Sequence, residues 1–155
     1  MTPPFTIFAS ITMDTGMTSF GNILGFGTPN NNVFNREFRV TPNKDLEYGQ
    51  LYGGGWSSVS GQPQTSFQYN QKYDVAVVRL ADNNVYLYVD GVEIVQGTLV
   101  AEDPGTTNLG TSIGKSCRQT HDCDQDFIGK IENLKIYDVD MRSSIPSLSA
   151  PCRGN

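Results

Sequence analysis

The sequence has few of the residues from which catalytic centres and nucleic-acid-binding surfaces are built. Its 155 residues include one histidine, three cysteines and eleven lysines or arginines, and the formal net charge is −5. A nucleic-acid partner requires a basic surface, so no nucleic acid is expected to bind. A Ser-His-Asp or Cys-His centre needs a histidine as its base, and His121 lies in a polar stretch without a catalytic motif. We therefore expect no enzymatic activity.

Long hydrophobic runs and helical periodicity are missing as well. No apolar stretch approaches the roughly 20 residues that cross a bilayer, so we expect no membrane insertion by this chain. No segment keeps apolar residues at the spacing of an amphipathic helix. Charged residues make up only 17% of the chain, and glycine occurs 16 times. This balance is typical of a turn-rich, all-β domain, and the length fits one such domain.

Alternation of apolar and polar residues predicts a series of short strands. In Phe5–Met13 every second residue, beginning with Phe5, lies on one face that is apolar throughout. Asp90-Gly91 lies between two apolar runs and favours a type I′ hairpin, because both central residues can take positive φ. Many short strands separated by turns are typical of a sandwich or barrel. Further strands are predicted at residues 22–27, 34–40, 46–52, 67–69, 73–80, 85–89, 92–95, 109–113 and 128–137.

Two segments are predicted to lie outside the strands. Three glycines precede Trp56 and begin a long flexible loop that runs to about Gln64. The chain from Met141 onward is rich in serine and proline. We therefore predict one domain at residues 3–141, followed by a tail or linker at residues 142–155.

The order of these segments resembles that of a known group of sandwiches. The segment YDVAVVRLADNNVYLYVDGVEI at residues 73–94 resembles the paired strands of concanavalin A-like and laminin-G-like domains. The segment GKIENLKIY at residues 129–137 resembles the last strand of the same domains. The resemblance implies an all-β fold, a two-sheet antiparallel jelly-roll sandwich of the concanavalin A-like lectin/glucanase type.

More narrowly, the chain resembles the C-terminal lectin-like domain of the trypanosomal trans-sialidase superfamily. Catalysis in that family belongs to a separate propeller, so the resemblance carries over no catalytic residue. It implies a non-catalytic, carbohydrate-binding-like or structural accessory domain of a larger cell-surface or secreted protein. Its partner would be a glycan or a neighbouring domain of the same parent protein. The similar segments are Phe5–Met13, Ile23–Gly27, Leu51–Gly53, Lys72–Val75, Val85–Gly91 and Asn133–Asp138.

Trp56 is the candidate platform for a sugar ring. It follows three glycines in the predicted loop, so its indole is expected to be presented to a ligand. Tyr48, Tyr52 and Asn31 could add to the same ligand-binding surface. The alternative is that the one tryptophan is packed, with its N–H bonded to a single partner.

A glycan-cleaving enzyme of the glucanase type would need a pair of carboxylates at a defined separation. Glu37, Asp45 and Glu47 are scattered along the sequence, and no such pair is marked on one strand. This absence favours a binding domain over a hydrolase.

The three cysteines leave two kinds of site open. Cys117 and Cys123 close a short loop and form the candidate disulfide, which would indicate an oxidising compartment and leaves Cys152 odd. A zinc site that also uses His121 is the alternative, but five residues separate the two thiols, against two to four in most structural zinc sites.

Asp122, Asp124 and Asp126 alternate in the same loop, which would place three carboxylates on one side of an extended chain. Calcium is the candidate ion for such a group of hard oxygens, and a solvated acidic loop is the alternative. Calcium binding would favour an alternative to the carbohydrate-binding-like domain, namely a laminin-G-like adhesion module that binds a protein partner.

Overall fold

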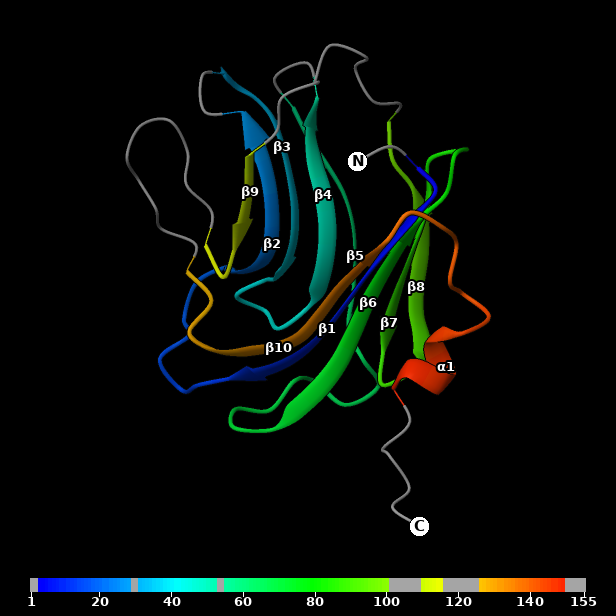
Figure 1. Ribbon diagram of the computed structural model, residues 1–155. Coiled ribbons are helices and arrows are strands. Elements are labelled where there is room, and N and C mark those ends of the chain that lie inside the picture. The colour runs from blue at the N-terminus through cyan, green and yellow to red at the C-terminus, as the bar shows by residue number, and fades with distance from the viewer. Residues whose placement is uncertain (1–2, 29–30, 53–54, 101–109, 116–125, 150–155) are drawn as a thin grey trace.

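The structure is a computed structural model that describes residues 3–28, 31–52, 55–100, 110–115 and 126–149. In this part of the chain nearly all regular structure is β-strand, with one short helix (Figure 1). The elements are β1 (Phe5–Met13), β2 (Gly21–Thr28), β3 (Asn31–Val40), β4 (Leu46–Tyr52), β5 (Gly55–Gly61), β6 (Lys72–Arg79), β7 (Asn84–Val89), β8 (Val92–Thr98), β9 (Gly110–Ile113), β10 (Gly129–Tyr137) and α1 (Ile145–Leu148).

The strands form two five-stranded antiparallel sheets that pack face to face. Sheet A has the order β10-β1-β6-β7-β8, and sheet B has the order β5-β4-β3-β2-β9. Every pair of neighbouring strands is antiparallel. The predicted all-β, two-sheet antiparallel sandwich is therefore confirmed.

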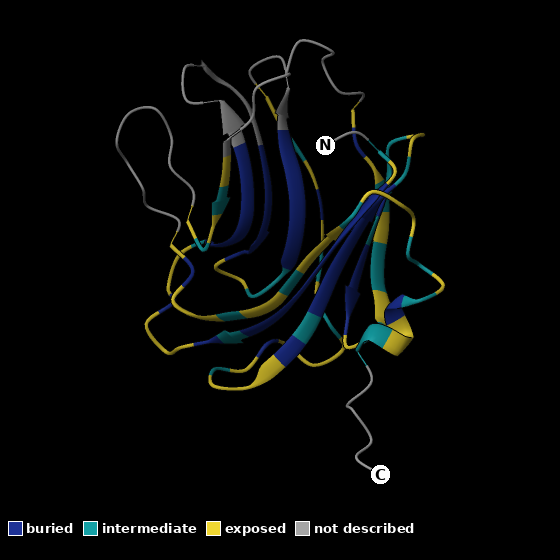
Figure 2. Cartoon of the chain, viewed as in Figure 1, coloured by how far each residue is buried: buried dark blue, intermediate teal, exposed yellow. Residues whose placement is uncertain are grey.

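The core lies between the sheets, and β1 shows why. Its alternating residues Phe5, Ile7, Ala9, Ile11 and Met13 all have no exposed surface, as the alternation predicted. Successive side chains of a strand point to opposite faces, so the apolar set of each strand enters the core together. Figure 2 shows this burial running along the facing strands of both sheets.

The outer face of sheet A carries a second, smaller apolar cluster. Phe8, Val78 and Tyr88 lie on this face and pack with the fully buried Ile145 of α1. The Thr6 hydroxyl donates to the Val139 carbonyl at 2.8 Å and holds the segment that leads to the helix. Residues before and within α1 are therefore packed against the sandwich, and the division of the chain at residue 141 stays a prediction.

Two details differ from the sequence expectation. The expected loop from Gly53 to Gln64 contains β5, which pairs with β4 from Leu46↔Gly61 to Tyr52↔Gly55. Serines and glycines hide the alternation there, because Val59 is its one buried aliphatic side chain. The expected strand at residues 67–69 is wrong. Phe67 is fully buried, but the Gln68 N–H donates to the Tyr73 hydroxyl at 2.9 Å instead of to a strand partner.

The Asp90-Gly91 turn joins β7 to β8 in the predicted hairpin. Asp90 has φ 49° and Gly91 has φ 81°, so both residues are in the left-handed region that a type I′ turn requires. A Cβ on Gly91 would also lie 3.1 Å from the Pro146 Cα of α1. The glycine therefore serves both the turn and the close approach of the helix.

Gly91→Ala is expected to lower the free energy of unfolding by about 1–2 kcal/mol, because alanine is strained at positive φ. Gly16→Ala is the matched control, since a Cβ there would lie 3.6 Å from the Ile128 side chain, an ordinary contact. Urea unfolding of the two variants measures the difference. Equal stabilities would show that neither the turn nor the helix contact constrains residue 91.

Candidate functional site

The outer face of sheet B buries charged side chains. On β3, Glu37 and Arg39 flank the core residue Phe38 and so point to the opposite face, where they are 3% and 6% exposed. The register pairs Arg39 with Glu47 of β4, which is 8% exposed. Buried charges persist only when they are paired, so this group must be held together by its own contacts.

The Arg39 guanidinium binds both carboxylates. Its Nη1 donates to Glu37 Oε2 at 2.5 Å, and its Nε donates to Glu47 Oε1 at 2.7 Å. The Ser58 hydroxyl of β5 donates to the other Glu47 oxygen at 3.3 Å. One cation thus connects three strands of sheet B, directly or through Glu47.

Two aromatic rings enclose the same guanidinium. Its central carbon lies 4.1 Å from the centre of the Phe20 ring and 4.4 Å from the centre of the Trp56 ring. Phe20 immediately precedes β2 and Trp56 belongs to β5, so the rings approach from opposite sides of β3. Such contacts between arginine and aromatic faces are favourable and strengthen when water is excluded. We call Glu37, Arg39, Glu47, Phe20 and Trp56 the Arg39 cluster.

A glycine keeps Trp56 close to the sheet. Gly49 of β4 points outward beneath the indole, where a Cβ would come within 2.5 Å of the ring atom Cζ2. Trp56 nevertheless remains 39% exposed. The result is an indole that lies across the sheet, with Arg39 on one side and part of its surface open to solvent.

The family follows from the sequence match. A family model described as the concanavalin A-like lectin/glucanases superfamily matches residues 2–144. The chain belongs to this superfamily. No curated protein sequence is significantly similar to it.

Several solved structures with the same fold belong to proteins that act on glycans. The chain is 18% identical to the CBM40 domain of the Ruminococcus gnavus IT-sialidase, with a TM-score of 0.78, 95% of this chain covered and 83% of that one. The chain is also 17% identical to domain 4 of AbnA, a GH43 extracellular arabinanase from Geobacillus stearothermophilus, in a structure with arabinotriose. This match has a TM-score of 0.71 and covers 95% of this chain and 66% of that one.

The chain also resembles a trypanosomal protein in its fold. A Trypanosoma rangeli sialidase structure is 23% identical, with a TM-score of 0.66; the match covers 94% of this chain and 22% of that chain. The resemblance to sialidase-associated lectin-like domains is therefore confirmed at the level of the fold.

Two of the side chains expected to bind a ligand are described, Trp56 and Tyr48, and of these Trp56 lies at an exposed surface. Tyr48 is fully buried and packs edge-on against Phe5, with ring centres 6.1 Å apart. The alternation along β4 turns Tyr48 into the core and its neighbours Glu47 and Gly49 outward, so Tyr48 does not contribute to an exposed surface. The side chains of Asn31 and Tyr52 lie outside the described residues, and their roles stay predictions.

The sequence did not reveal the Arg39 cluster. Glu37 and Glu47 are ten positions apart, and only the β3–β4 register brings both to one guanidinium. The signal available in the sequence was the alternation of charged Glu37 and Arg39 around apolar Phe38. Such alternation is typical of a strand with one polar face, but it does not identify the neighbouring strand.

The candidate disulfide and calcium residues fall largely outside the described part of the chain. Cys117, Cys123, Asp122 and Asp124 lie there, as do His121 and Cys152. Asp126 is described; its Oδ1 lies 3.9 Å from the Lys115 Nζ in an exposed ion pair. Among the described residues no group of three histidine, cysteine, aspartate or glutamate side chains could hold a metal. The disulfide and the calcium site stay predictions.

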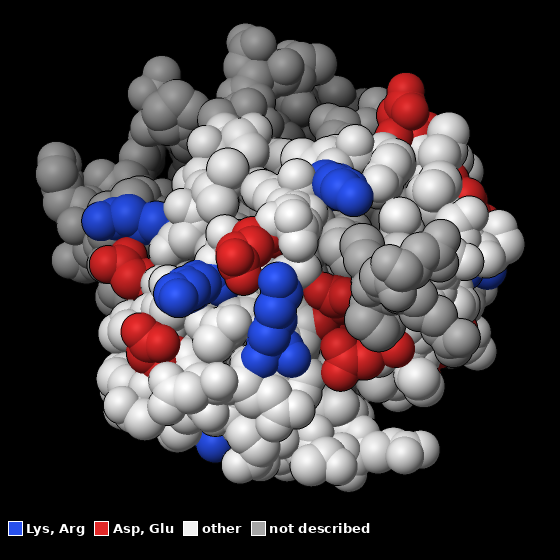
Figure 3. Space-filling model, turned by 60° about the horizontal axis from the view of Figure 1, so that its bottom comes forward, with Lys and Arg blue, Asp and Glu red and all other residues white. Residues whose placement is uncertain are grey.

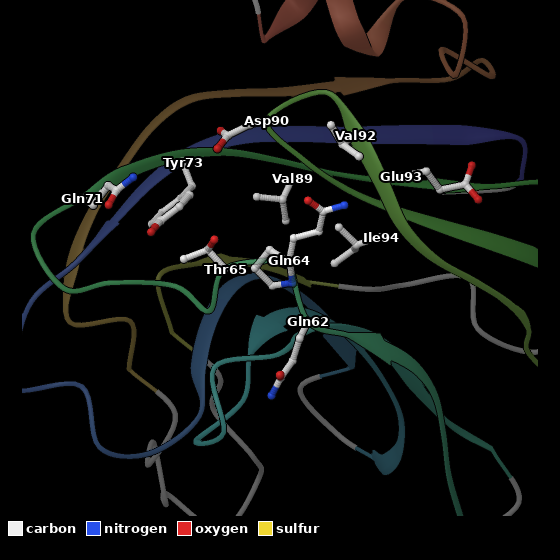
Figure 4. A pocket seen from close by; sticks show the side chains of 11 residues that line it. Gln62, Gln64, Thr65, Gln71, Tyr73, Val89, Asp90, Val92, Glu93 and Ile94 are labelled. Atoms are coloured by element: carbon white, nitrogen blue, oxygen red, sulfur yellow. The ribbon is translucent and has the colours of Figure 1, made fainter.

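A pocket of about 530 Å³ lies elsewhere on the molecule. The segment after β5, the start of β6 and the β7–β8 hairpin line it (Figure 4). Val89, Ile94 and Gln64 lie together in this view, whereas the Glu93 carboxylate points away from them. The volume suits a small molecule. Trp56 and the Arg39 cluster do not line this pocket, so it is a separate feature.

The shifted pKa values belong to Tyr88 of sheet A and to Asp140 in the segment after β10. Burial, reinforced by the Glu93 carboxylate, raises the pKa of the Tyr88 phenol above its usual value of 10.0. A hydrogen bond from Arg142 lowers the pKa of Asp140 below 3.8. Both shifts move the pKa further from neutral pH, whereas a general acid or base has a pKa near the working pH. Neither Tyr88 nor Asp140 is therefore suited to exchange a proton near neutral pH.

Acidic and basic side chains are interspersed on the face of the molecule shown in Figure 3. Lys72 of β6 and Glu132 of β10 form an exposed ion pair at 3.2 Å. Among the described residues, no helix is both long enough and apolar enough to cross a membrane.

Arg39→Ala is expected to lower the free energy of unfolding by about 3–5 kcal/mol, because it leaves two buried carboxylates without their partner. Arg142→Ala is the matched control, since Arg142 also pairs with an acid and lies over a tyrosine ring but is 37% exposed. The control should lose less than about 1 kcal/mol. Denaturant unfolding compares the two, and similar losses would contradict the buried role of Arg39.

Proposed function

We propose that the chain is a non-catalytic, carbohydrate-binding accessory domain, and that its ligand lies on the outer face of sheet B at Trp56. The observation that carries this proposal is the position of Trp56, whose exposed indole lies on the outer face of sheet B beside a buried polar cluster. An aromatic surface offers a sugar ring an apolar contact, and the polar groups beside it fix the orientation of a ligand.

The two outer faces of the sandwich favour this assignment. On sheet A, α1 and the chain before it cover the apolar side chains. On sheet B, Trp56 is open, and Ser58 and Ser60 lie exposed on the same face of β5. A ligand that contacts Trp56 therefore meets hydroxyl groups at the same surface.

The proposal also concerns the parent protein, of which this chain would be one domain. The sialidase structures that it resembles are several times longer than this chain, which fits a domain that accompanies others in a parent protein. We place that protein outside the cell or at its surface. Support for this location comes from the proposed Cys117–Cys123 disulfide, since disulfides persist in oxidising compartments.

Trp56→Ala is expected to weaken glycan binding by about tenfold or more, equivalent to at least 1.4 kcal/mol. Isothermal titration calorimetry with the tightest ligand from a glycan array measures this change. Gln64→Ala, in the separate pocket, is the control and should bind as the unmodified domain does. Unchanged affinity in Trp56→Ala, or a loss in Gln64→Ala alone, would move the site away from sheet B.

A further inference from the structure

The Arg39 cluster has an excess of negative charge. It contains two carboxylates, Glu37 and Glu47, and one guanidinium, so its formal charge at neutral pH is −1. Lys115 lies near the same face, where its carbonyl accepts a hydrogen bond from Asn22 Nδ2 at 2.8 Å. The Lys115 ammonium is itself paired with Asp126. Arg39 and Lys115 are thus each paired with at least one acid.

The Arg39 guanidinium is already occupied. Its Nε and Nη2 atoms face Glu47 and its Nη1 faces Glu37, while its central carbon lies over the rings of Phe20 and Trp56. Arginine usually recognises a ligand carboxylate through two parallel N–H groups on one edge. In the Arg39 cluster, the carboxylates of Glu37 and Glu47 already occupy these edges, and only 6% of Arg39 is exposed.

The exposed hydroxyl beside Trp56 is oriented to accept a hydrogen bond. The Ser58 O–H donates to Glu47 Oε2, which leaves the lone pairs of Ser58 Oγ for a ligand. A sugar hydroxyl can donate its proton to such an acceptor. An ionised carboxylate has no proton to donate and would also be repelled by the net charge beneath.

We propose that this face selects neutral glycans and discriminates against sialylated ones. The inference rests on the proposed function, because it concerns the ligand class of the same site. It sets the chain apart from the CBM40 domain with the same fold, whose structure is bound to α2,3-sialyllactose.

An array of neutral glycans, each paired with its sialylated form, tests the proposal. For the tightest neutral ligand, calorimetry should find the sialylated counterpart about tenfold weaker or more, from Coulomb repulsion. Preferred or equal binding of sialylated glycans would overturn the inference and leave the carbohydrate-binding function intact. Binding of no glycan at all would overturn both.

The electrostatic cause has its own test. Raising the ionic strength from 0.1 M to 1 M shortens the screening length from about 10 Å to about 3 Å, so the preference for the neutral ligand should shrink. Glu47→Gln makes the cluster formally neutral while it keeps an acceptor for Arg39, and it should also shrink the preference.

Glu132→Gln is the control for that variant. It changes the charge of the whole protein by the same amount, but it lies on β10 of sheet A, where Glu132 is half exposed. The control should keep the full preference. A preference that is insensitive both to salt and to Glu47→Gln would show that charge does not cause it.

Discussion

The outer face of sheet B depends on one buried guanidinium. Arg39 connects β3 to β4 through Glu47, and it contacts the rings of Phe20 and Trp56 at either side. Charges removed from water must be compensated by close contacts, and here both carboxylates and both rings supply them. The position of the exposed indole is thus a consequence of how this single cation is paired.

Both sheets have five antiparallel strands, but different kinds of side chains cover their outer faces. Sheet A presents Phe8, Val78 and Tyr88, and the chain returns as α1 to cover them with Ile145. Sheet B presents charged and hydroxyl side chains around Trp56. A covered apolar face contributes stability, whereas a polar face with one open aromatic ring has the features of a ligand surface.

Much of the fold could be predicted because alternation is a local signal. Phe5–Met13 and the Asp90-Gly91 hairpin have the predicted structure, since neighbouring residues alone decide them. The site depends instead on pairing between strands. Trp56 was identified, but Glu47 meets Arg39 and Glu37 only through the β3–β4 register. Tyr48 was predicted at the ligand surface, but a tyrosine side chain suits either face of a strand. The core residues that it contacts, such as Phe5, lie far away in the sequence.

The central claim is that a glycan binds on the outer face of sheet B at Trp56. The most direct measurement is a ¹H–¹⁵N NMR titration of the domain with the tightest glycan from the array. The account predicts that the largest shifts occur at the Trp56 indole N–H and at backbone amides of Glu47 and Ser58. Shifts that gather around Gln64 and Ile94, with the Trp56 signal unchanged, would place the ligand in the other pocket and contradict the account.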